Sequence, residues 1–121
     1  MGAVILIVED NEKNMRLISD LLSVSGYTTL KAVNGQQGVV LAREKKPNLI
    51  LMDIQMPVMD GLEATKTLKN DKTTINIPII ALTSYAMKGD KEKMLSVGCD
   101  GYLSKPFHVN ELLKTVAKYL K

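Results

Sequence analysis

Leu49-Ile50-Leu51-Met52-Asp53 is the stretch that decides the fold, because four successive apolar residues are closed by a carboxylate. An unbroken apolar run of this length is typical of a strand that is buried on both faces of a parallel sheet. A turn-forming segment follows, which contains Pro57 and the pair Asp60-Gly61. We therefore predict a buried strand that ends in an acidic residue at one edge of the sheet.

Three further apolar runs end in polar residues in the same way. Residues 3–8 lead into Glu9-Asp10, residues 77–82 into Thr83-Ser84, and Tyr102-Leu103 into Ser104-Lys105-Pro106. Right-handed crossovers place the carboxyl ends of parallel strands at one edge of a sheet, where ligands bind in open α/β folds. We therefore expect these carboxylates, hydroxyls and the lysine to converge at that edge.

Strand-like and helix-like segments alternate along the whole chain. The expected strands are residues 3–8, 27–32, 48–53, 77–83 and 101–104. The expected helices are residues 12–25, 35–46, 61–70, 87–97 and 109–120. The last helix has the clearest apolar period, through Val109, Leu112, Leu113, Val116, Ala117 and Leu120. Five strand–helix units predict an α/β, flavodoxin-like (βα)5 doubly wound parallel sheet of strand order 2-1-3-4-5, with the second strand at an edge.

Size and composition narrow the class of protein. A chain of 121 residues suits one domain, so we expect residues 1–121 to form a single domain without an output domain. The net charge is +3, but the basic residues are scattered and aromatic residues make up only 4%, which disfavours direct nucleic-acid binding. We expect no membrane insertion, because no apolar run reaches the roughly 18 residues that a spanning helix needs. Cys99 is the single cysteine and fits a reducing cytoplasm, where we expect the protein to act.

Three carboxylates at one edge of the sheet predict a metal site. Glu9, Asp10 and Asp53 would repel one another without a cation, and Mg²⁺ prefers oxygen ligands. We assign Asp10 and Asp53 as direct ligands, Glu9 as a ligand through water, and the backbone carbonyl of Gln55 as a further ligand. Two alternatives stay open: Asp10 is the N-cap of the helix at residues 12–25, or Asp53 is a turn-forming residue.

Asp53 is also the candidate acceptor of a phosphoryl group. Transfer needs positive charge and hydrogen-bond donors around the phosphoryl oxygens, which Lys105 and Thr83 would supply. A cis Lys105–Pro106 bond would aim the lysine inward. Tyr85 is expected to screen the phosphorus from water, unless its ring points outward to a partner. Alternatively, Thr83 caps the following helix and Lys105 is a solvated surface residue.

The chain resembles a response-regulator receiver domain, the phosphoacceptor module of two-component signalling. The resemblance spans essentially all 121 residues. The motifs that carry it are Val8-Glu9-Asp10-Asn11, residues 51–61, Ile80-Ala81-Leu82-Thr83-Ser84 and Tyr102-Leu103-Ser104-Lys105-Pro106. Residues 86–90 further resemble single-domain DivK-type regulators and the receivers of hybrid histidine kinases. One departure is Glu9, where many members carry Asp.

The resemblance implies that a histidine kinase or a histidine phosphotransfer protein phosphorylates Asp53, with Thr83 and Tyr102 as the switch pair. It also implies output through a protein that binds the fourth helix, fifth strand and fifth helix. We expect no enzymatic turnover beyond gain and loss of this phosphoryl group. The alternative is a Mg²⁺-dependent phosphatase with an aspartate nucleophile, which typically needs a second carboxylate where this chain has Gln55. A flavin carrier is weaker still, because Glu9 and Asp10 would repel its phosphate.

Overall fold

The computed structural model describes residues 2–54, 59–83, 88–105 and 107–120. Its centre is a parallel sheet of five strands in the order β2-β1-β3-β4-β5. The strands are β1 (Val4–Val8), β2 (Thr28–Ala32), β3 (Leu49–Asp53), β4 (Ile79–Thr83) and β5 (Gly101–Ser104). The helices are α1 (Glu12–Val24), α2 (Gly35–Lys45), α3 (Gly61–Lys69), α4 (Lys88–Ser96) and α5 (Val109–Tyr119). The predicted fold class and strand order are confirmed.

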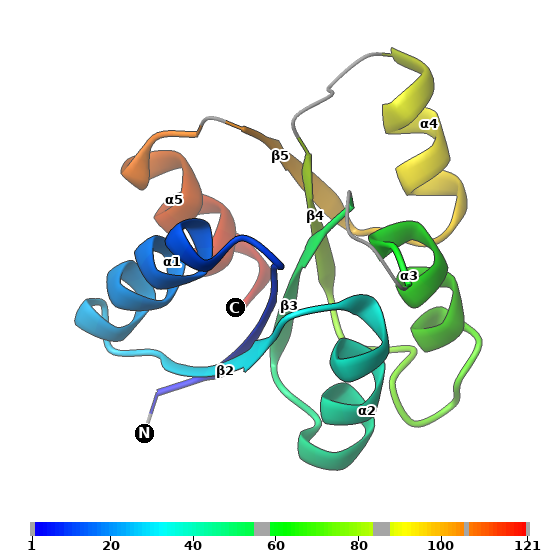
Figure 1. The fold of residues 1–121 in the computed structure, drawn as a ribbon, viewed down its shortest axis with the longest axis horizontal. Coiled ribbons are helices and arrows are strands. Elements are labelled where there is room, and N and C mark those ends of the chain that lie inside the picture. The colour runs from blue at the N-terminus through cyan, green and yellow to red at the C-terminus, as the bar shows by residue number, and fades with distance from the viewer. Residues whose placement is uncertain (1, 55–58, 84–87, 106, 121) are drawn as a thin grey trace.

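The helices cover both faces of the sheet, α1 and α5 on one side and α2, α3 and α4 on the other (Figure 1). Successive side chains of a strand point to opposite faces. In β1, Ile5 and Ile7 therefore join the core beneath α1 and α5, whereas Leu6 and Val8 join the core beneath α2, α3 and α4. Cys99 lies in the core beneath α2, α3 and α4 and is only 5% exposed.

The start of β4 differs from the prediction by two residues, since the strand begins at Ile79 rather than at residue 77. The Ile77 N–H is used in a turn, where it donates to the Thr74 carbonyl at 3.0 Å. Pro78 has no N–H to donate to a neighbouring strand. The apolar run at residues 77–83 therefore includes the last residues of a turn as well as the strand.

The last helix is less deeply buried than its apolar period suggests. Only Leu112 and Val116 are fully buried, whereas Val109 is 45% exposed and Ala117 is exposed. The helix shares its face of the sheet with α1 (Figure 1). A helix at the flank of a layer buries only a narrow apolar stripe, so part of the apolar surface of α5 stays open to solvent.

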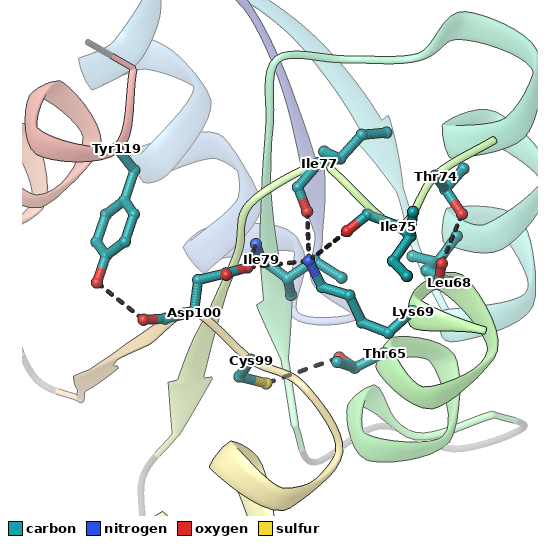
Figure 2. A network of polar contacts seen from close by, with 10 residues as sticks. All are labelled: Thr65, Leu68, Lys69, Thr74, Ile75, Ile77, Ile79, Cys99, Asp100 and Tyr119. Atoms are coloured by element: carbon teal, nitrogen blue, oxygen red, sulfur yellow. Dashed lines mark hydrogen bonds and ion pairs between the residues drawn. The ribbon is translucent and has the colours of Figure 1, made fainter. Parts of the chain in front are cut away.

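A polar network joins the elements at the edge where β4 and β5 begin (Figure 2). The Lys69 ammonium donates to the carbonyls of Ile75 and Ile77 and, at 3.1 Å, to the Asp100 carboxylate. The same carboxylate accepts the first N–H of β4 at 2.8 Å. The Tyr119 hydroxyl donates to the Asp100 carbonyl at 2.9 Å. The ends of α3 and α5 are thereby tied to the sheet at the edge opposite the carboxyl ends of the strands.

Among the described residues, no helix combines the length and the apolar character that a bilayer crossing requires.

Candidate functional site

The register of the sheet brings the predicted polar residues together. Val8 of β1 lies opposite Met52 of β3, so Glu9 and Asp53 follow on neighbouring strands. Asp53 in turn lies opposite Leu82 of β4, directly before Thr83. The expected convergence at the carboxyl ends of the strands is confirmed.

Three carboxylates form a compact acidic cluster at this edge. One ligand oxygen each from Glu9, Asp10 and Asp53 lie within 4.8 Å of one another. Glu9 is 1% exposed and Asp53 is 3% exposed, while Asp10 faces solvent. Buried carboxylates are costly unless they are paired or coordinate a metal.

Lys105 reaches into this cluster from the end of β5. Its Nζ lies 2.8 Å from Glu9 Oε1 and 3.3 Å from Asp53 Oδ2. The lysine side chain is only 17% exposed, so the alternative of a solvated surface lysine is wrong. Three carboxylates and one ammonium leave an excess of negative charge, and all the donors are carboxylate oxygens. This donor set fits a hard divalent cation such as Mg²⁺.

The ion pairs hold Glu9 and Lys105 in their charged forms. Burial by itself would raise the pKa of Glu9, but hydrogen bonds from the Lys105 ammonium and the Asn11 N–H, together with the charge of Lys105, lower that pKa below its ordinary value. Burial likewise opposes the charge on Lys105. Its hydrogen bond to Glu9 and the charge of Asp53 outweigh that effect and raise the pKa of Lys105. Glu9 and Lys105 therefore form an ion pair at neutral pH.

Asn11 was not predicted to take part, yet it shapes the loop after β1. Its side-chain oxygen accepts the Asn14 N–H at 3.0 Å and so caps α1. Its own N–H donates to Glu9 Oε2 at 3.2 Å. The alternative role of Asp10 as the helix cap is therefore wrong. Asparagine is among the strongest N-cap residues, and its position just before residue 12 is the signal that identifies it.

Thr83 and Tyr102 lie on the neighbouring strands β4 and β5. Thr83 is 1% exposed, and its carbonyl accepts the Lys105 N–H at 2.7 Å. Tyr102 lies opposite Ala81 and packs, half-buried, against the core beneath α2, α3 and α4. The structure thus places both members of the expected switch pair on adjacent strands, with Thr83 bonded to the main chain of Lys105.

Three expectations concern residues outside the described part of the chain. They are the carbonyl ligand at Gln55, the screening ring of Tyr85 and the cis bond between Lys105 and Pro106.

Comparison with known proteins gives one family. Residues 5–117 match the response regulator receiver domain. The polar-differentiation response regulator DivK of Brucella anthropi is 51% identical to this chain over 116 residues, which is 96% of this chain and 94% of that protein. DivK of Brucella ovis is 50% identical over the same shares of the two chains.

Solved structures agree in fold. The chemotaxis protein CheY4 of Vibrio cholerae superposes with a TM-score of 0.94 at 31% identity, covering 99% of this chain and 100% of that one. The receiver domain of the sensor histidine kinase PA1611 from Pseudomonas aeruginosa, described with a magnesium ion coordinated in its active-site cleft, gives a TM-score of 0.93 at 38% identity over 99% of this chain and 98% of that one. The sheet order, the acidic cluster and these matches lead to one conclusion: this chain belongs to the response regulator receiver domain family.

Proposed function

We propose that this chain accepts a phosphoryl group on Asp53 and signals by changing its affinity for a partner protein. One observation carries the proposal: the buried Asp53 carboxylate lies 3.3 Å from the Lys105 ammonium and in one cluster with Glu9 and Asp10. A carboxylate held beside a fixed cation is suited to receive a phosphoryl group, because the cation stabilises the negative charge on its oxygens in the transition state.

The donor is a phosphohistidine on a histidine kinase or a phosphotransfer protein. One Asp53 carboxylate oxygen attacks phosphorus, the P–N bond breaks, and the imidazole leaves with the electron pair and takes up a proton. Lys105 binds a phosphoryl oxygen and the Thr83 hydroxyl donates to another. Asp10 and Asp53 would hold Mg²⁺ directly, with Glu9 through water and the Gln55 carbonyl as a further ligand. The metal ion would neutralise charge on the transferred group.

The output follows from the position of Thr83 and Tyr102 on adjacent strands. Engagement of Thr83 by the phosphoryl group would shift the half-buried Tyr102 and alter the surface formed by α4, β5 and α5. Residues 1–121 would act as one receiver domain whose output passes through that partner, without direct nucleic-acid binding.

The phosphatase alternative predicts turnover of small phosphoesters. The position two residues after Asp53, where such enzymes need a general acid, is Gln55. Assay of p-nitrophenyl phosphate hydrolysis should therefore give no more turnover than an Asp53→Asn variant.

The direct test is labelling with acetyl phosphate in the presence of Mg²⁺, followed by mapping of the modified residue by mass spectrometry. We expect one phosphoryl group on Asp53, and none after Asp53→Asn or chelation of Mg²⁺. Asp20→Asn is the matched control, because Asp20 is an exposed carboxylate on α1 and should leave labelling intact. Labelling that survives Asp53→Asn would contradict the proposal.

A further inference from the structure

Gly35, the first residue of α2, contacts the loop that follows the phosphoacceptor strand. Its N–H donates to the Met59 carbonyl at 3.0 Å. A Cβ built on Gly35 would lie only 2.2 Å from that oxygen and 2.9 Å from the Met59 carbonyl carbon. Real Cβ atoms do not approach backbone so closely, and Gly35 is buried. The helix can therefore reach this loop only because residue 35 has no side chain.

Gly61, the first residue of α3, makes a second contact of the same kind, directly on Asp53. Its N–H donates to the Ile54 carbonyl at 3.2 Å. A Cβ on Gly61 would lie 2.2 Å from the Asp53 carbonyl oxygen. Neither Gly35 nor Gly61 has a positive φ, so space rather than backbone conformation requires glycine at both positions.

The two contacts are adjacent in the chain. Met59 accepts from Gly35, Asp60 caps α3 by accepting the Glu63 N–H at 2.9 Å, and Gly61 follows at once. On the other side, the Ile54 N–H donates to the Leu82 carbonyl at 3.0 Å. The main chain at Asp53 is thus held on one side by β4. On the other side it is held by Gly61, whose position depends on the contact between Gly35 and Met59.

We propose that Gly35 is a positioning residue for the phosphoacceptor, a role that rests on the proposed function. By holding Met59, it fixes Gly61 and hence the main chain that carries the Asp53 carboxylate. A functional constellation must be held to within about 0.5 Å. A methyl group at residue 35 would move Met59 or α2 by more than that, because its contact at 2.2 Å would be with a backbone oxygen that cannot rotate away.

The first test is the Gly35→Ala variant, measured at a temperature where it is folded. We expect Mg²⁺, titrated by calorimetry, to bind about tenfold more weakly, at the lower end of the loss typical for an outer-shell partner. Phosphorylation by acetyl phosphate at subsaturating Mg²⁺ should slow in parallel and recover at saturating Mg²⁺.

Gly101→Ala is the matched control. A Cβ on Gly101 would meet the Tyr119 hydroxyl at 2.7 Å, at the opposite edge of the sheet. This variant also adds a methyl group in a close contact, but the Tyr119 side chain can turn aside. Gly101→Ala should therefore lower the unfolding temperature less than Gly35→Ala does, while Mg²⁺ binds as in the wild type. A purely structural role of Gly35 would leave Mg²⁺ binding unchanged in both variants.

The second test uses the wild-type protein with ¹⁵N-labelled glycine. On titration with Mg²⁺, the amide resonances of Gly35 and Gly61 should shift together with one affinity, while those of Gly26, Gly98 and Gly101 stay in place. This measurement decides the matter even if Gly35→Ala does not fold, because an unmoved Gly35 amide would overturn the proposal.

These experiments distinguish failure of the positioning role of Gly35 from failure of the proposed function. Equal Mg²⁺ affinity of Gly35→Ala and the wild type would refute the positioning role and leave phosphorylation of Asp53 untouched. A wild-type protein that neither binds Mg²⁺ nor is labelled on Asp53 would refute the proposed function and the positioning role together.

Discussion

Lys105 determines the charge balance of the site. Its ammonium pairs with two buried carboxylates, at 2.8 Å from Glu9 and 3.3 Å from Asp53. Without the Lys105 ammonium, the negative charges of both carboxylates would lack this compensation in a region of low dielectric. Mg²⁺ would then be the remaining source of positive charge at the cluster, so the effects of the lysine and of the metal ion on stability should be coupled.

Lys105→Met tests that coupling. The variant should lose about 3 kcal/mol of unfolding free energy in the absence of Mg²⁺, because it removes the compensating cation from buried carboxylates. Saturating Mg²⁺ should stabilise it more than it stabilises the wild type. Urea unfolding with and without Mg²⁺ measures both effects, with the exposed Lys114→Met as control. Equal stabilisation of the two proteins by Mg²⁺ would show that Lys105 does not compensate this cluster.

The contribution of Asp71 to folding stability should depend on pH. Hydrogen bonds from the N–H and hydroxyl of Thr73, and then from Arg43, lower the pKa of Asp71 from 3.8 to about 2. The unfolded chain therefore binds this proton more readily than the folded one. Ionised Asp71 stabilises the fold above about pH 3.8, and that contribution is lost as the pH falls toward 2. Asp71→Asn should lower the urea midpoint at neutral pH, with a difference from wild type that narrows over this window; a difference independent of pH would rule the mechanism out.

At the scale of elements, the network around Lys69 ties helices to strands (Figure 2). The lysine side chain is 16% exposed and donates to two carbonyls and to the Asp100 carboxylate. The Asp100 carboxylate also accepts the first N–H of β4, and its carbonyl accepts the Tyr119 hydroxyl. Loss of the lysine would therefore affect the junctions of α3 with β4 and of β4 with β5.

Lys69→Met should lower the unfolding free energy by about 2 kcal/mol, since one ammonium makes all three bonds and a single hydrogen bond to a charged group is worth roughly 1.5–3 kcal/mol. Tyr119→Phe should cost about 1 kcal/mol, as expected for one neutral hydrogen bond. Lys66→Met is the control on the exposed surface of the same helix. A Lys69 effect no larger than that of Lys66 would mean that the network contributes no net stability.

Much of each element followed from local sequence, and the exceptions have physical causes. Apolar runs located four of the five strands, and the alternation of strands and helices located the more polar β2. Pro78 cannot donate a backbone hydrogen bond, so β4 begins later than its apolar run. The period of α5 was right, yet Val109 is open because burial depends on what covers a helix. The pairing of Lys105 with Glu9 and Asp53 was not predicted, because a long side chain reaches carboxylates that only the folded register brings near. The contacts of Gly35 with Met59 and of Gly61 with Asp53 join residues that are separated in the sequence, so no local sequence pattern predicts them.

At the scale of the whole molecule, the acidic cluster should link stability to metal. Binding to the folded state alone stabilises a protein by roughly 2.7 kcal/mol at a hundredfold excess of ligand over Kd. We expect Mg²⁺ to raise the unfolding temperature of the wild type, with a reduced rise for Asp10→Asn. Thermal unfolding with Mg²⁺ and with chelator measures both. An unchanged unfolding temperature at saturating Mg²⁺ would argue against a metal site at this cluster.

The sheet divides the interior into two cores, and Leu6 and Ile7, neighbours in the chain, belong to different ones. Substitutions in separate cores that lie more than about 10 Å apart share no packing partners, so we expect their effects on unfolding free energy to add. Gene duplication followed by mutation can therefore diversify the helices of one layer while the other layer is inherited unchanged. Such a fold gives descendants new binding preferences without simultaneous compensating mutations on both sides of the sheet.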